Sequence, residues 1–208
     1  MTDRYSVLIA DGVLAGVLLG FVFFAQEGSP PVFQDTFLEV SPAAAVSLDR
    51  KIALIRQAES DLERYESAAS TVEITEIEME SFILYEMEDN IPAKVESIDV
   101  GIGVETISAL TELTFSVEET GEFMLDYLMG GTHSLLVEGR LEAKQGSGKF
   151  ALLGVRLDGF PVPIGLVEML VGQFVTPRYP MVDLSKPFDV PWGIEEVVLS
   201  PGLATITY

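Results

Sequence analysis

The sequence predicts an α+β fold in which a curved antiparallel sheet packs on two helices, preceded by an N-terminal transmembrane helix and a long amphipathic helix. Three observations predict it: a long apolar segment opens the chain, a seven-residue apolar repeat follows, and later segments alternate apolar and polar residues. We therefore divide the chain into a transmembrane anchor or signal segment (1–25), a linker (26–40), an amphipathic helix (41–71) and an α+β domain (72–208).

The first segment, residues 5–25, is apolar apart from Asp11. At about 1.5 Å per residue it is long enough to cross a hydrocarbon core of about 30 Å. Its second part alone has the length of a signal-peptide core, but it ends in a poor cleavage site, so we favour an uncleaved anchor over a cleaved signal. Because Arg4 precedes the run and the next basic residue is Arg50, the positive-inside rule keeps the N-terminus in the cytoplasm and exports the rest.

The composition excludes several classes of protein. With 33 acidic and 12 basic residues, the formal net charge of -21 repels nucleic acid. The absence of cysteine excludes disulfides, a thiol nucleophile and a zinc–thiolate site. The single histidine, His133, excludes a histidine-based metal cluster, and we expect it on the surface or at a strand end. No nucleophile-elbow, phosphate-loop or zinc-protease motif is present, so we expect no enzyme, metal or cofactor.

A long helix is predicted over residues 42–68, with Ser41 as its N-cap and Pro42 at its first position. Its apolar seam recurs every seven residues, at Leu48, Ile55, Leu62 and Ala69. The seam has three possible roles: it pairs with a second copy, forms a stalk, or packs along the following domain. In the anchor, three glycines spaced by four residues offer a further dimer contact, although glycine is common in membrane helices.

A second helix is predicted over residues 75–89, because Thr75 and Glu78 have the spacing of a capping box. Its apolar face comprises Met79, Phe82, Ile83 and Met87.

Strands are predicted next, at 98–104 and 113–117, where apolar and polar residues alternate. The connection at 105–108 leaves open whether they are two strands or one bent strand. A hairpin is predicted at 133–144 and 149–158, with Gly154 marking a bulge, because the apolar parity shifts there. A final hairpin is predicted at 194–200 and 203–208, around a Pro-Gly turn.

Two apolar segments lie between the predicted strands. Residues 121–131, which include Met124 and Leu128, form either a short buried element or a mobile lip around a cavity. The predicted helix 164–175 is apolar on nearly every side, through Ile164, Val167, Leu170, Val171 and Phe174 among others. Such a helix must be buried nearly all round or must face an apolar ligand.

The region 72–208 resembles the bacterial envelope proteins with a TULIP-like (tubular lipid-binding) domain. The resemblance is carried by residues 74–78, which open the first helix, 159–163 before the second, and 190–194 leading to 201–203. It implies a curved sheet that wraps helices around an apolar channel. It also implies a binder of lipid or another long apolar ligand outside the cytoplasm. Together with the predicted anchor, this places the protein at the inner (cytoplasmic) membrane, with one span and the C-terminal domain in the periplasm.

We therefore expect a membrane-anchored protein that binds a lipid or another long apolar ligand. The residues expected to contact that ligand are Met79, Phe82, Ile83, Met124, Leu128, Ile164, Val167, Leu170, Val171 and Phe174. The alternative is a non-enzymatic envelope scaffold with a solid core, which self-associates as a homodimer through the anchor and the long helix. The expected partners are the membrane and an apolar molecule, with no nucleic acid.

Overall fold

The computed structural model describes residues 39–62, 69–86, 94–115, 131–170 and 187–208. Three helices lie within them: α2 (Pro42–Leu62), α3 (Glu76–Glu86) and α5 (Ile164–Leu170). Nine strands form one sheet: β1 (Thr71–Thr75), β2 (Lys94–Ile102), β3 (Thr106–Phe115), β4 (Gly131–Lys144), β5 (Ser147–Leu157), β6 (Phe160–Val162), β7 (Phe188–Asp189), β8 (Glu196–Ser200) and β9 (Leu203–Thr207). The predicted α+β class with an antiparallel sheet is confirmed for these residues.

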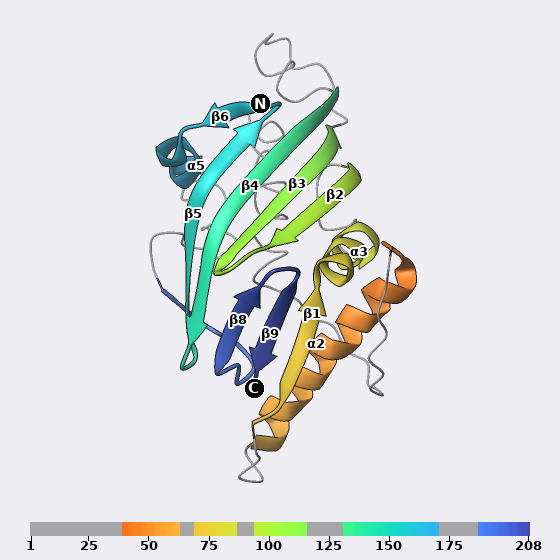
Figure 1. Cartoon of the computed structure of the whole chain (residues 1–208), viewed down its shortest axis with the longest axis vertical. Helices are drawn as coiled ribbons and strands as arrows, with labels where there is room; N and C mark the ends of the chain where they lie inside the picture. Colours follow the sequence, from red (N-terminus) through yellow and green to blue (C-terminus); the bar gives the residue numbers. More distant parts are fainter. Residues whose placement is uncertain (1–38, 63–68, 87–93, 116–130, 171–186) are drawn as a thin grey trace, which may run out of the picture.

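Strand β4 organises the sheet because it is the longest strand and pairs along both of its edges (Figure 1). One edge of β4 pairs with β5 over residues 135–144. The other edge pairs with β3 over residues 131–140 and then with β8 at Ala143 and Lys144. The sheet therefore divides beside β4 into two arms, β3–β2 and β8–β9–β1.

The turns account for the hairpins. Gln145 and Gly146 have φ angles of 55° and 73°, as a two-residue hairpin turn with the twist of its strands requires. Gly202, with φ 78°, supplies the left-handed position of the predicted Pro-Gly turn between β8 and β9, which confirms the final hairpin. Glu105, with φ 58°, closes a turn between β2 and β3, so these are two strands rather than one bent strand. Val104 is 69% exposed in this turn and does not continue the buried face of β2 as predicted.

The predicted bulge in β5 is confirmed. Glu138 pairs with Gly154, but the next residue of β4, Gly139, pairs with Leu152, so Leu153 is the extra residue. The inward parity therefore changes between Phe150 and Val155, both of which are buried. Gly139 is required because the Phe150 ring lies on its backbone: a Cβ added there would be 2.1 Å from Cζ of that ring.

Helices α2 and α3 lie beside β1 and the end of β2, and α2 runs alongside α3 and β1 (Figure 1). Ser41 caps α2 by accepting a hydrogen bond from the Ala44 N–H at 3.3 Å, as predicted. The seam residues Leu48 and Ile55 are 4% and 1% exposed. Leu48 belongs to the same buried cluster as the sheet residues, so α2 packs along the domain, which was one of its three possible roles.

The capping box at the start of α3 is confirmed. The Glu78 N–H donates to Thr75 Oγ1 at 3.3 Å, and the Thr75 N–H donates to Glu78 Oε2 at 3.0 Å. Thr75 also ends β1, a strand that the sequence analysis did not predict. The predicted extent of the amphipathic helix is therefore wrong at 69–71: the seam residue Ala69 is exposed and not helical, and Thr71 pairs with Thr207 of β9.

Strand β2 is an edge strand, and two carboxylates of α3 cover its backbone donors. Glu76 accepts the Ile102 N–H at 2.7 Å, and Glu80 accepts the Val100 N–H at 2.9 Å. Burial raises the pKa of Glu80, against the lowering effect of the Val100 hydrogen bond. Two residues four apart on the helix thus face two residues that are two apart on the strand. Their carboxylates occupy an edge at which another strand would otherwise pair.

Several predictions lie outside the described residues. They are the anchor at 5–25, most of the linker at 26–40, the part of the predicted first helix at 63–68, the part of the predicted second helix at 87–89, the end of the predicted strand at 116–117, the segment 121–130, and the part of the apolar helix beyond Leu170.

Candidate functional site

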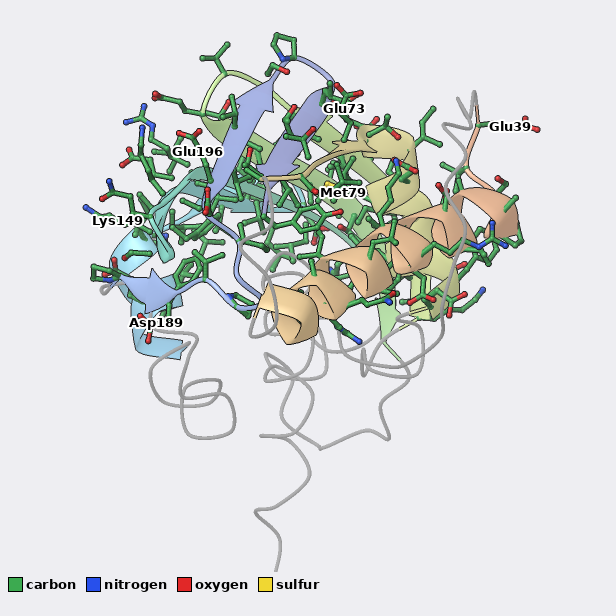
Figure 2. All side chains as sticks on the ribbon, turned by 90° about the horizontal axis from the view of Figure 1, so that it is seen from below. Glu39, Glu73, Met79, Lys149, Asp189 and Glu196 are labelled. Carbon is green, nitrogen blue, oxygen red and sulfur yellow. The ribbon has the colours of Figure 1, made fainter. Side chains whose placement is uncertain are left out.

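An apolar cavity of about 160 Å³ lies between helices α2 and α3 and the sheet. Helix α2 lines it with Leu48, Ile52 and Ile55, and α3 lines it with Met79, Phe82 and Ile83. The sheet contributes Ile74, Ile107, Leu141, Ala143, Val197, Leu199, Ala204 and Ile206. Figure 2 shows Met79 between α2 and the sheet. Among the residues that the structure describes, no charged side chain lines this cavity.

Helical spacing accounts for the two helical walls. Leu48, Ile52 and Ile55 recur at i, i+4 and i+7 and therefore share one face of α2. Met79, Phe82 and Ile83 recur at i, i+3 and i+4 and share the facing side of α3. Of the ten residues that the sequence predicted to contact a ligand, the structure brings these last three together.

The remaining wall is the cover segment, residues 188–194, which contributes Phe188, Val190, Pro191, Trp192 and Ile194. The Val190 N–H donates to the Gly146 carbonyl at 2.8 Å, and Phe188 pairs with Gly148 of β5. Trp192 and Gly193 take left-handed φ angles of 62° and 67°, which turn the chain back towards β8. The cover segment is thus fixed at both ends, on the β4–β5 turn and at the start of β8.

Arg56 of α2 holds the middle of the cover segment. Its guanidinium carbon lies 4.8 Å from the centroid of the Trp192 ring, which is within the range of a cation–π contact. This contact joins the α2 wall of the cavity to the cover segment.

A buried ion pair fixes α2 against α3. Glu78 is 1% exposed, and Lys51 lies 2.6 Å from its Oε1 and 2.7 Å from its Oε2. Lys51 also donates to the Glu73 carbonyl at 2.6 Å, and the Ser47 hydroxyl donates to Glu78 Oε1 at 2.7 Å. All three ammonium donors of Lys51 therefore have acceptors within the fold. Because Glu78 precedes the cavity residue Met79, this network positions the α3 wall.

His133 forms a second polar site, away from the cavity lining. Its Nδ1 lies 2.8 Å from Asp158 Oδ2, and Asp158 Oδ1 accepts the Ser134 N–H at 2.9 Å. The hydrogen bond with His133, followed by that from Ser134, lowers the pKa of the Asp158 carboxyl. His133 lies near the start of β4, which confirms the strand-end alternative of its prediction; it is 6% exposed, so the surface alternative does not apply, and its side chain points to the same face as the buried residues of β4.

The other predicted ligand contacts do not line this cavity where they are described. Val167 is 2% exposed in the main core, and Ile164 is 36% exposed at the start of α5. Of the two alternatives for this helix, burial on nearly every side is wrong for its described part, because Ile164 and Leu166 are exposed; contact with an apolar ligand stays a prediction. The side chains of Leu170, Met124, Leu128, Val171 and Phe174 lie outside the described residues.

Sequence reasoning did not assign Ile52 or Trp192 to the site. A signal existed for Ile52, which lies on the same helical face as the predicted seam residues Leu48 and Ile55. For Trp192 there was none, because its position depends on contacts with α2 and with the β4–β5 turn, which are distant in sequence.

Among the described residues, no group of acidic or histidine side chains is arranged to hold a metal ion. Within the same residues, no helix is both long enough and apolar enough to cross a membrane. No protein family, curated protein or solved structure that we compared with the chain matches it.

Proposed function

We propose that this protein binds the apolar part of a lipid or of another long apolar molecule in the cavity between α2, α3 and the cover segment. The observation that carries the proposal is a cavity of about 160 Å³ whose lining, over the described part of the chain, contains no charged side chain. Cavities of about 150 Å³ lined by Leu, Ile and Phe stay dry and bind benzene. A space of this size takes a ring or the end of an acyl chain, and the rest of a longer ligand stays outside it.

The expected affinity follows from the size of the cavity. A ligand that places about six carbon atoms inside, as benzene does, gains about 0.8 kcal/mol for each buried methylene, or about 5 kcal/mol in all. That free energy corresponds to a dissociation constant of about 0.2 mM. Binding of a short single-chain probe should therefore be measured at concentrations from about 0.01 to 2 mM.

The test uses Trp192, the only tryptophan of the chain, as a probe inside the cavity wall. The full chain is placed in phosphatidylcholine nanodiscs and titrated with 8-bromo-1-octanol, whose bromine quenches tryptophan fluorescence on contact. We expect saturable quenching of Trp192. The whole chain is needed because α2 supplies three residues of the lining: Leu48, Ile52 and Ile55.

Two variants of β8 provide the control. Val197 lines the cavity, whereas its neighbour Val198 is 49% exposed on the opposite face of the strand. V197F fills cavity volume and should abolish the saturable quenching, and V198F should retain it. Equal quenching in the two variants, at matched denaturation midpoints, would contradict binding in this cavity.

The proposed setting is extracytoplasmic, with residues 5–25 as a membrane anchor. If this is right, the full-length protein resists carbonate extraction, and protease added from outside digests the domain. A soluble species that begins near residue 26 would contradict the anchor. The scaffold alternative gains no support from α2, because self-association through Leu48 and Ile55 would first require the helix to leave its own core.

A further inference from the structure

Several exposed apolar side chains gather in one short segment that follows β5, residues 159–166, which we call the apolar tip. Phe160 is 76% exposed, Leu166 43% and Ile164 36%, and the two prolines of the segment are exposed as well. The apolar tip contains no charged residue, although 22% of the chain is charged. A single exposed apolar side chain is ordinary, but several in one uncharged segment indicate a surface that contacts a protein or a membrane.

The fold fixes the apolar tip in its exposed position. Asp158 and Gly159 have φ angles of 51° and 79° and close a two-residue turn, after which β6 pairs with the end of β5. Val167 follows the tip in α5, and its side chain is 2% exposed in the main core. Strand β6 and helix α5 lie at the end of the sheet away from β8 and β9 (Figure 1). The tip is therefore held on both sides by packed or paired residues.

The length of chain before α2 indicates what this surface contacts. In the proposed setting residues 5–25 cross the membrane, and the 13 residues 26–38 separate them from Glu39, the first described residue. Thirteen residues span at most about 47 Å when they are fully extended. A folded domain of about 170 residues has a radius of gyration of about 15 Å. A domain tethered in this way stays beside the bilayer and can turn any of its faces towards it.

We infer that the apolar tip inserts into the surface of the bilayer that holds the anchor, with Phe160, Ile164 and Leu166 between the headgroups and the acyl chains. The inference rests on the proposed membrane setting. Apolar and aromatic side chains are favoured at this boundary, and the tip brings no charge into it. The bilayer thus supplies an apolar contact for the exposed side of α5.

The charges around the apolar tip indicate which lipid it meets. The charged residues nearest to it in the sequence are Arg156, Asp158 and Glu168, one cation and two carboxylates, and all three are exposed. The chain as a whole carries a formal net charge of -21. Anionic headgroups repel an acidic protein, so the tip inserts into a zwitterionic surface in preference to an anionic one.

The experiment places the full chain in phosphatidylcholine nanodiscs, one chain in each, so that a second copy cannot cover the tip. Because the chain has no cysteine, G165C gives a single site for the fluorophore NBD, and a Cβ at residue 165 meets no atom within 4 Å. The matched control is E142C, which carries the same label at an exposed position of β4 near the β4–β5 turn.

The quencher is a phosphatidylcholine with a nitroxide on acyl carbon 5, because an interfacial segment is buried by about 5 to 10 Å. We expect the quencher to reduce the fluorescence of the label at residue 165 and to leave that at residue 142 unchanged. In phosphatidylglycerol nanodiscs at low salt the quenching at residue 165 should be weaker, and added salt should restore it.

Two variants assign the quenching to the apolar tip. F160S/L166S removes two of its exposed side chains and should abolish the quenching at residue 165. V198S removes a valine that is 49% exposed on β8 and should leave the quenching unchanged. The replaced side chains are all exposed, so the urea midpoints should stay close to that of the parent chain.

The possible outcomes separate this inference from the proposed function. Equal quenching at residues 165 and 142, or quenching that F160S/L166S leaves unchanged, would refute insertion of the tip. A blue-shifted emission at residue 165 without quenching by the lipid would also refute it, because the chain itself would then cover the tip. If carbonate extracts the full chain from membranes, the anchor fails and the inference fails with it. Binding in the cavity is read separately, through quenching of Trp192 by 8-bromo-1-octanol.

Discussion

The ion pair between Lys51 and Glu78 predicts a large and specific loss of stability. In K51M the Glu78 carboxylate, 1% exposed, loses its only cation among the contacts described here but keeps hydrogen bonds from Ser47 and Thr75. Removing one partner of a buried pair costs about 3 to 5 kcal/mol. Because those hydrogen bonds remain and Lys51 is 19% exposed, we expect a loss near 3 kcal/mol.

The double variant K51M/E78L shows whether the loss comes from an unpaired buried charge. It removes both charges, and only the hydrogen-bond donors that bound Glu78 lose their acceptor. Leaving such donors unsatisfied costs about 1 to 3 kcal/mol of stability. Replacing a buried pair by apolar groups is often neutral. K51M/E78L should therefore be at least as stable as K51M, although it carries one more substitution.

Urea denaturation of the full chain in nanodiscs, followed by circular dichroism, measures the free energy of unfolding. The matched control is K94M, which breaks the exposed pair between Lys94 and Glu96, where Lys94 is 62% exposed. Such surface pairs contribute about 0 to 1 kcal/mol. A K51M loss no larger than that of K94M, or strict additivity of the K51M and E78L losses, would refute the reasoning.

Two further predictions concern positions outside the cavity. G139A places a Cβ 2.1 Å from the Phe150 ring and should lower the free energy of unfolding by about 1 to 3 kcal/mol. The smaller side chain in G139A/F150L should restore part of this stability. An equal loss with and without F150L would contradict the contact. The pKa of Asp158 is lowered because its carboxylate forms hydrogen bonds with His133 and Ser134. These bonds therefore stabilise the fold fully when the pH is above the unfolded-state pKa of an aspartate. Their contribution disappears as the pH falls through the lower, folded-state pKa. D158N should thus be less stable than wild type at pH 6, and urea midpoints should converge on acidification; a constant difference down to pH 2 would contradict it.

The parts of the fold that sequence predicted are those set by neighbouring residues. The capping box of Thr75 and Glu78 and the bulge at Gly154 each depend on a few consecutive positions, and the structure has both. Strand β1 was missed because it is short and ends at Thr75, which also caps α3, so the helix signal began where the strand ended.

The candidate site was predicted only in part, because a cavity depends on contacts between distant segments. The apolar face of α3 was visible as a helical pattern, and Met79 does line the cavity. The seven-residue repeat of α2 predicted which face of the helix is apolar. It did not predict which part of the protein that face packs against. The apolar run that begins at Ile164 suggested a ligand contact, yet Val167 lies in the core instead, since periodicity shows that a residue is apolar but not what it touches.

The pairing of β1 with β9 has a consequence for how the chain folds during synthesis. Thr71 pairs with Thr207 and Thr75 with Leu203, so the first and the ninth strand of the described residues, which are far apart in the sequence, lie side by side. Contacts between such distant residues form late, because the cost of closing a long loop comes first. Ile74 of β1 and Ala204 and Ile206 of β9 all line the cavity. A nascent chain that lacks residues 203–207 therefore cannot complete this cavity, which forms only after β9 has been made.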